Sequence, residues 1–509
     1  MSRSESPEAG TTAGAVRGRR EAGLDVFRGI PYAQPPVGEA RFAAPRPAER
    51  WDGVRETTAF GPPPPQESFG LDAPSAAPWS PPADDDWLTV NVWTPEADPA
   101  ARRPVMVWIY GGAYKMGSAD DPAYDGGRLA SDGDLVVVTL NYRVGVEGFL
   151  HIEGAPANRG LLDQVAALEW VRDNITAFGG DPDQVTVFGE SAGAGSVAAL
   201  LAMPRARGLF RRAIAQSVPG PYFSDALARD IGAAVAGELG LRPTVADLAG
   251  VDPRKLPEAG AALGGRMRDF LPRWGTAALT ATPYSPVVDG DVLPVVPWTA
   301  LAEGVARDVE LIVGHNRDEF RLFLMMGGLL GKVDDQMASA ALAAFGPAPD
   351  AEQAYRAAVP DASAEQLFEL VQSDWLFRMP SVHLADAQTA GGGRAYLYEL
   401  TWSAPVHGGA LGACHGLDVP LVFGPHGGGL GTLLIGPEPT PETEQLSAYV
   451  RSAWTAFART GDPGWPAYDP ENRLTLLLDT EPTVTAYPEE AARRMWERHA
   501  FEALPLIAG

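Results

Sequence analysis

The hydrophobic positions of the chain follow two alternating patterns, which predict strands followed by helices. Continuous apolar runs at residues 105–110 and 135–140 have the length and the β-branched composition of buried strands. Between residues 161 and 178 the apolar side chains recur every three or four positions, which indicates one face of a helix. Gly179 and Gly180 follow, as expected at a helix C-terminus. Further elements are predicted by the same patterns, namely strands at 309–313 and 395–400 and a helix at about 444–459.

Strands that alternate with helices are typical of the α/β class, with a large, mostly parallel central sheet covered by helices on both faces. We expect residues 1–16 to form a disordered tail, because they are rich in Ser, Glu, Ala, Gly and Thr. Residues 17–509 are expected to form a single domain with insertions. Residues 62–82 are crowded with Pro, Ala and Ser and predict an extended loop, and 424–431 is a glycine-rich loop that lacks the lysine of a phosphate loop.

Composition narrows the classes of partner. The chain has 40 Lys and Arg against 65 Asp and Glu, and the net charge of −25 disfavours nucleic acid or an anionic membrane as a partner. A single cysteine, Cys414, excludes an intramolecular disulfide and a multi-cysteine zinc site. The N-terminal residues lack the apolar core of a secretory signal, and no apolar run is long enough for a membrane span. We therefore expect a soluble, cytoplasmic protein. We also expect a monomer.

One short motif carries the strongest chemical signal. Gly189-Glu190-Ser191-Ala192-Gly193 lies between a strand-like run at 184–188 and a small-residue, helix-like stretch at 194–202. A strand, a sharp turn and a helix in this order form a nucleophile elbow, in which a strained backbone exposes the serine hydroxyl and the flanking residues must be small. Ser191 is therefore the predicted nucleophile.

A serine nucleophile needs a base and an acid that orients the base. In a hydrolase with this elbow the acid and then the histidine follow the serine along the chain. Asp318 and Glu319 both follow the predicted strand at 309–313 and fit the acid. For the base, histidines in loops after the strand at 395–400 are preferred over His499, which leaves His407, His415 and His426. The residues alone leave both choices open.

Several separated motifs occur in an order that resembles the type-B carboxylesterases, the family that includes the cholinesterases and bacterial para-nitrobenzyl esterases. The resemblance runs from about Val16 to the C-terminus and is carried by residues 28–33, 35–38, 91–93, 163–164, 178–182 and 188–193. It implies an α/β-hydrolase fold with helical insertions around an active-site gorge, and catalysis without a cofactor or a metal. It also implies a triad of Ser191, Glu319 in the turn 316–319, and His415 before Gly416.

The resemblance implies roles for several neighbours of the triad. The backbone amides of Gly112, Ala113 and Ala192 would stabilise the oxyanion, with Gly111 supporting the same turn. Glu190 would face the site and stabilise the protonated histidine; the alternative is that it is only a buried, hydrogen-bonded glutamate. Ser217 would hydrogen-bond the triad's acid; the alternative is that its hydroxyl only satisfies a polar group in the core.

One departure from the family concerns the oxyanion donors: most relatives have a third glycine where this chain has Ala113, which keeps the N–H but narrows the permitted backbone. The others concern the substrate. Cholinesterases have an aromatic residue near Lys115, which here either lines the gorge or points into solvent. Trp79 is either a cation–π platform or an ordinary loop residue, and the apolar segment 320–330 either borders the entrance or packs in the core.

We expect a broad hydrolase of short- to medium-chain and aryl esters, acting through an acyl-enzyme. The alternative is a carbamate or amide hydrolase of the same family, and the least favoured reading is a non-catalytic interaction module.

Overall fold

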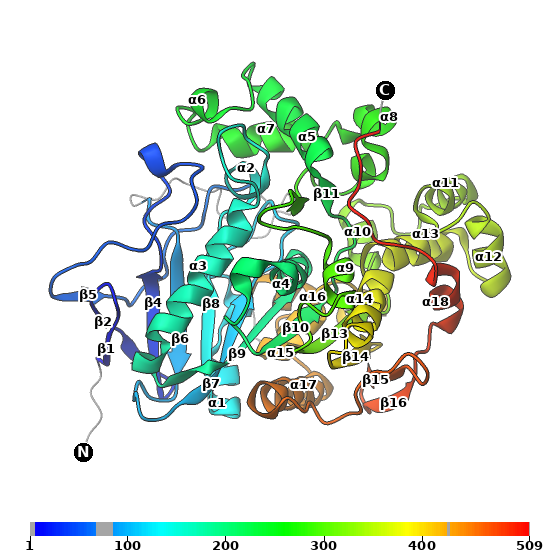
Figure 1. Ribbon diagram of the computed structural model, residues 1–509. Coiled ribbons are helices and arrows are strands. Elements are labelled where there is room, and N and C mark those ends of the chain that lie inside the picture. Colours follow the sequence, from blue (N-terminus) through cyan, green and yellow to red (C-terminus); the bar gives the residue numbers. More distant parts are fainter. Residues whose placement is uncertain (1–5, 68–84, 425–427, 508–509) are drawn as a thin grey trace.

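Seven parallel strands form the centre of the structure, a computed structural model that describes residues 6–67, 85–424 and 428–507 (Figure 1). In spatial order they are β8 (Val136–Leu140), β7 (Arg103–Ile109), β9 (Gly180–Glu190), β10 (Arg212–Gln216), β13 (Glu310–Asn316), β14 (Ala395–Leu400) and β15 (Leu474–Leu478). The strands predicted at 105–110, 135–140, 184–188, 309–313 and 395–400 are confirmed as β7, β8, β9, β13 and β14.

Antiparallel strands complete the eleven-stranded sheet at both edges. They are β16 (Thr483–Ala486) at one edge and β6 (Thr89–Thr94), β4 (Leu24–Pro31) and β3 (Arg19–Glu21) at the other. The side chains of β7, β8, β9 and β10 are buried almost throughout, because helices cover both faces of the central strands. The predicted α/β class is confirmed.

Two groups of helices cover the sheet (Figure 1). The first contains α3 (Arg159–Asn174), α4 (Ala192–Ala202), α9 (Pro297–Ala302) and α14 (Met379–Ala390), and the second contains α1 (Gly127–Gly133), α15 (Asp418–Phe423) and α17 (Pro441–Thr460). The helix predicted at 161–178 is α3 with a short 3₁₀ turn, and it ends at Gly179 with a φ of 83°. The helix predicted at 444–459 is α17.

The predicted disordered tail is wrong for part of residues 1–16. Strands β1 (Glu8–Gly10) and β2 (Ala15–Arg17) pair with each other and with β5 (Val54–Glu56). Ala9 and Val16 are buried in the hydrophobic core, and Arg17 forms ion pairs with Glu8 and Glu56. The polar composition of this segment did not indicate that two of its apolar residues, Ala9 and Val16, pack in the core. The single domain over 17–509 stays a prediction, supported by one core cluster that extends from Ala9 to Phe501.

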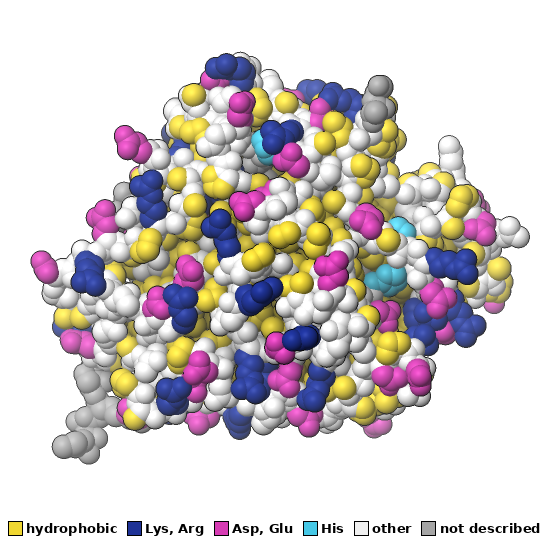
Figure 2. All heavy atoms as spheres, viewed as in Figure 1, with side chains coloured by type: hydrophobic (Ala, Val, Ile, Leu, Met, Phe, Trp, Pro, Cys, Tyr) yellow, Lys and Arg dark blue, Asp and Glu magenta, His cyan; other side chains and the backbone are white. Residues whose placement is uncertain are grey.

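The outer face shown in Figure 2 carries acidic and basic side chains interspersed over the whole view, with apolar atoms between them. In the described ranges, no helix combines the length and the apolar character required to cross a membrane. Among the same residues, no three His, Cys, Asp or Glu side chains come together as a metal site would require.

Candidate active site

Ser191 lies at the turn between β9 and α4, at the carboxyl end of a central strand. Its φ of 56° and ψ of −124° form the strained backbone predicted for a nucleophile elbow. A Cβ atom on Gly193 would lie 2.1 Å from the carbonyl oxygen of Ile109, and one on Gly189 would lie 2.6 Å from the backbone of Gly193. Both flanking positions therefore require glycine, as the motif predicts.

Glu319 lies fully buried just after β13 and is held by hydrogen bonds on both carboxylate oxygens. Its Oε1 accepts from the Ser217 hydroxyl at 2.6 Å and from the backbone N–H of Asn316 at 2.8 Å. Its Oε2 lies 2.6 Å from Nδ1 of His415. The structure thus joins Ser217, Glu319 and His415, residues that the sequence separates by about 100 positions each.

The other candidates for the acid and the base lie elsewhere. Asp318 forms an ion pair with Arg317 at 2.9 Å and accepts the N–H of Ala413. His407 is exposed, and His499 packs against the ring of Trp496. The remaining candidate, His426, falls outside the described residues, as does Trp79.

Glu190 links the elbow to the imidazole. Its Oε1 lies 3.2 Å from Nε2 of His415, and among the described residues this oxygen accepts no hydrogen bond. Burial raises the pKa of the Glu190 carboxyl, although His415 opposes the shift. Burial by itself lowers the pKa of His415, but the carboxylates of Glu190 and Glu319 outweigh burial and raise this pKa above its ordinary value. The site therefore favours an imidazolium.

The glycine turn after β7 lies against the elbow. A Cβ atom on Gly111 would lie 3.1 Å from Cβ of Ser191, and one on Gly112 would lie 2.2 Å from the carbonyl oxygen of Met116. Gly112 and Ala113 have φ values of 114° and 55°. In the described part of the chain, neither of their N–H groups donates a hydrogen bond to the backbone or to a side chain.

Ala192 supplies a third free donor beside the elbow, because it is the first residue of α4 and the first N–H groups of a helix have no intrahelical partner. Tyr114 fixes the position of the glycine turn. Its carbonyl accepts the N–H of Gly145 at 2.6 Å, and its buried ring reaches the backbone of α4 at Gly195.

The structure bears on two open questions about the surroundings. Lys115 is partly exposed, lies 3.6 Å from Glu67 and donates to the carbonyl of Ala281 at 3.4 Å, so it is not a lone cation. Residues Arg321–Met326 form a short helix, α10, in which Leu322 and Leu324 are buried. Phe323 on the same helix contacts the ring of His415 at 5.2 Å between centroids, so this segment both packs in the core and borders the site.

Some contacts of the triad candidates had no signal in the sequence. The ring of Phe377 stacks on His415 with 4.2 Å between centroids, although the two residues belong to different elements. Asn316 donates its side-chain amide to the carbonyl of Cys414 at 2.7 Å, which ties the acid's turn to the residue before the histidine.

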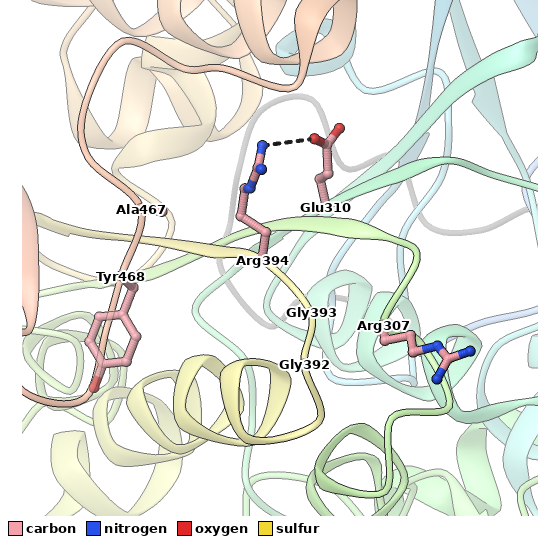
Figure 3. A pocket seen from close by; sticks show the side chains of 7 residues that line it. All are labelled: Arg307, Glu310, Gly392, Gly393, Arg394, Ala467 and Tyr468. Atoms are coloured by element: carbon pink, nitrogen blue, oxygen red, sulfur yellow. Dashed lines mark hydrogen bonds and ion pairs between the residues drawn. The ribbon is translucent and has the colours of Figure 1, made fainter.

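A hollow elsewhere on the molecule is unrelated to these residues (Figure 3). It lies at the amino ends of β13 and β14, opposite to the carboxyl ends that carry the triad candidates. Its lining consists of Arg307, Glu310, Gly392, Gly393, Arg394, Ala467 and Tyr468. Arg394 forms an ion pair with Glu310 at 3.5 Å, and Figure 3 shows Arg307 pointing away from this pair.

Comparison with known proteins gives one consistent result. The model of the carboxylesterase family matches residues 5–496. The chain is 40% identical to para-nitrobenzyl esterase of Bacillus subtilis, covering 95% of this chain and 97% of the relative. It is 36% identical to phenmedipham hydrolase of Pseudarthrobacter oxydans, covering 93% and 95%. The crystal structure of a Geobacillus stearothermophilus carboxylesterase, 38% identical, matches 96% of this chain and 99% of its own with a TM-score of 0.84. The predicted α/β-hydrolase fold is confirmed.

Proposed function

Because the chain belongs to the carboxylesterase family, we propose that it hydrolyses carboxylic esters with Ser191 as nucleophile, His415 as base and Glu319 as acid. The protein is an enzyme of the carboxylic-ester hydrolase class. The observation that carries the residue assignment is the hydrogen-bonded series from Ser217 through Glu319 to His415, which ends beside the elbow.

The reaction then has two halves. His415 takes the proton of the Ser191 hydroxyl as this oxygen attacks the ester carbonyl, and returns the proton to the leaving alcohol. An acyl-enzyme on Ser191 results. A water molecule, deprotonated by the same imidazole, then attacks the acyl-enzyme and releases the carboxylic acid product. Glu319 holds Nδ1–H, so Nε2 carries the lone pair that a base requires.

The tetrahedral intermediate places negative charge on the former carbonyl oxygen. The amides of Gly112, Ala113 and Ala192 are the proposed donors to this oxygen. Donors that are fixed before the reaction need no rearrangement in the transition state, and one such donor is typically worth roughly 10²–10³ in rate. The positive φ of Ala113 and Tyr114 shows that this turn is held in a conformation that costs free energy.

The proposed substrates are esters of short and medium acyl chains and aryl esters. We expect 4-nitrophenyl acetate and butyrate to be hydrolysed faster than long-chain triglycerides, because the sequence shows no lid-like helix with an exposed apolar face. A panel of 4-nitrophenyl esters of increasing chain length, assayed beside triolein as the long-chain triglyceride, tests this. A maximum rate on triolein would contradict it.

Carbamate or amide hydrolysis is the second candidate, favoured by the likeness to a relative named for phenmedipham hydrolysis. The same nucleophile and base serve this chemistry, but the nitrogen leaving group needs more efficient protonation. Adding phenmedipham and an anilide to the panel separates the two candidates by their kcat/KM. The cytoplasmic location and the monomeric state stay predictions.

The raised pKa of His415 predicts the pH dependence of the reaction. A base must be unprotonated, so kcat/KM should rise with pH along a limb above the ordinary histidine value of about 6.5. Glu190→Gln removes one carboxylate that raises this pKa, and the limb should therefore move to lower pH by roughly one unit. Profiles of kcat/KM from pH 5 to 10 measure the shift. Glu303→Gln, at an exposed position, is the matched control, and an unmoved or higher limb in Glu190→Gln would contradict the electrostatic argument.

A further inference from the structure

A π-helical turn, residues Asp374–Arg378, lies beside the acid and the imidazole and has no part in the mechanism above. It joins α13 (Ala364–Ser373) to α14, with the C-cap of α13 as its first residue. A π turn places one extra residue in a helix and redirects the side chains around it. Such turns are rare in proteins, but those that occur are often found at functional sites. The contacts of this turn show what it supports.

Phe377, within the turn, covers one face of the proposed base. Its ring is 3% exposed and stacks on His415, with 25° between the ring planes. Phe323 lies nearly parallel to Phe377, with 6.0 Å between centroids, and contacts the same imidazole. The hydrogen bond to Glu319 fixes one ring nitrogen, but the imidazole can still tilt about this bond. A ring packed on its face removes that freedom.

The same turn also holds the loop that carries the acid. The hydroxyl of Ser373, just before the turn, accepts the backbone N–H of Phe320 at 2.9 Å. The guanidinium of Arg378, at the end of the turn, donates to the carbonyl of Arg317 at 3.4 Å. Phe320 and Arg317 flank Glu319 on its two sides. Residues 373–378 therefore contact the acid's loop at two points and the imidazole at a third.

Buried charges keep the turn in place. Arg378 is 1% exposed and lies 3.1 Å from Asp374 and 3.2 Å from Glu489. The hydroxyl of Tyr355 donates to Asp374 at 2.6 Å. Removing one partner of a buried pair leaves a charge without compensation, which is strongly unfavourable, so alternative conformations of the turn are costly.

We propose that residues 373–378 form a cradle that sets the mutual position of the acid and the base, with Phe377 as a positioning residue for the imidazole. The catalytic consequence rests on the function proposed above, whereas the geometric consequence concerns the hydrogen bond between His415 and Glu319 alone. The two can be tested separately.

The first test replaces the stacked ring. Phe377→Leu keeps the site apolar but removes the flat face, and we expect kcat on 4-nitrophenyl acetate to fall by roughly 10–100-fold with KM within about threefold of the wild type. The low-field proton resonance of the His415–Glu319 hydrogen bond should shift or broaden in the same variant. Phe457→Leu is the matched control, because Phe457 is also fully buried but packs on Tyr396. The control should lose a similar amount of thermal stability and keep both kcat and the resonance.

The second test covers a failure of Phe377→Leu to fold. Ser373→Ala removes the acceptor for the Phe320 N–H with little change in volume, and we expect kcat to fall by roughly 3–10-fold at constant KM. Wild-type kcat and an unchanged resonance in every folded variant would overturn the proposal, as would an equal loss of kcat in Phe457→Leu. A wild-type protein without ester hydrolysis would instead overturn the proposed function, and the resonance would still test the cradle.

Discussion

Ser191→Ala should abolish ester hydrolysis, lowering kcat/KM by about 10⁴–10⁶-fold, while the protein remains folded. The side chain lost is a single hydroxyl, and the strained turn around it is fixed by the hydrogen bond from the Ser191 N–H to Gln216 and by the close contacts of its flanking glycines. Hydrolysis of 4-nitrophenyl acetate gives the rate, and circular dichroism with a thermal melt shows the fold.

Labelling by a fluorophosphonate provides the complementary measurement. The wild type should react with one equivalent at Ser191, located by mass spectrometry of the peptides, and the variant should remain unlabelled. Ser196→Ala is the control, because this serine lies on α4 directly after the elbow, is fully buried and accepts a hydrogen bond from Gln164. Near-normal turnover in Ser191→Ala would refute the assignment of the nucleophile, and an unlabelled wild type would favour a non-catalytic role.

Glu319→Gln should lower kcat by about 10³–10⁴-fold with little change in KM. Oε1 of Glu319 receives two donors, the Ser217 hydroxyl and the Asn316 N–H, so the amide oxygen of a glutamine must occupy this position. The amide NH₂ then faces Nδ1 of His415. A donor at this point selects the tautomer with a proton on Nε2, which cannot accept the proton of the serine.

Asp318→Asn is the matched control for the acid, since it changes the neighbouring carboxyl in the same way. Asp318 contacts Arg317 and the Ala413 N–H, but its contacts do not include the imidazole. We expect kcat within about tenfold of the wild type for this variant. The reverse outcome, a severe loss in Asp318→Asn and a mild one in Glu319→Gln, would transfer the acid's role to Asp318.

Local patterns predicted the elements of the fold and the elbow, because β-branched runs, helical periodicity and a glycine-flanked serine express preferences of neighbouring residues. They left the acid and the base open, since Asp318 and Glu319 are adjacent and several histidines follow the same strand. The family resemblance selected Glu319 and His415, and the structure brings these two side chains together.

Contacts between distant segments had no local signal. Neither the stacking of Phe377 on His415 nor the ion pair of Lys115 with Glu67 follows from the residues around each partner. The prediction of a disordered tail over residues 1–16 is wrong in part for a related reason, because Ala9 and Val16 are buried by strands that pair with a segment some 40 residues away.

The wide spacing of the three proposed catalytic residues affects biosynthesis. The elbow is complete by residue 193, but the imidazole comes from residue 415, beyond β14. A nascent chain released by premature termination before that point has a nucleophile without its base. Appearance of esterase activity during translation should therefore report that the ribosome has translated past His415.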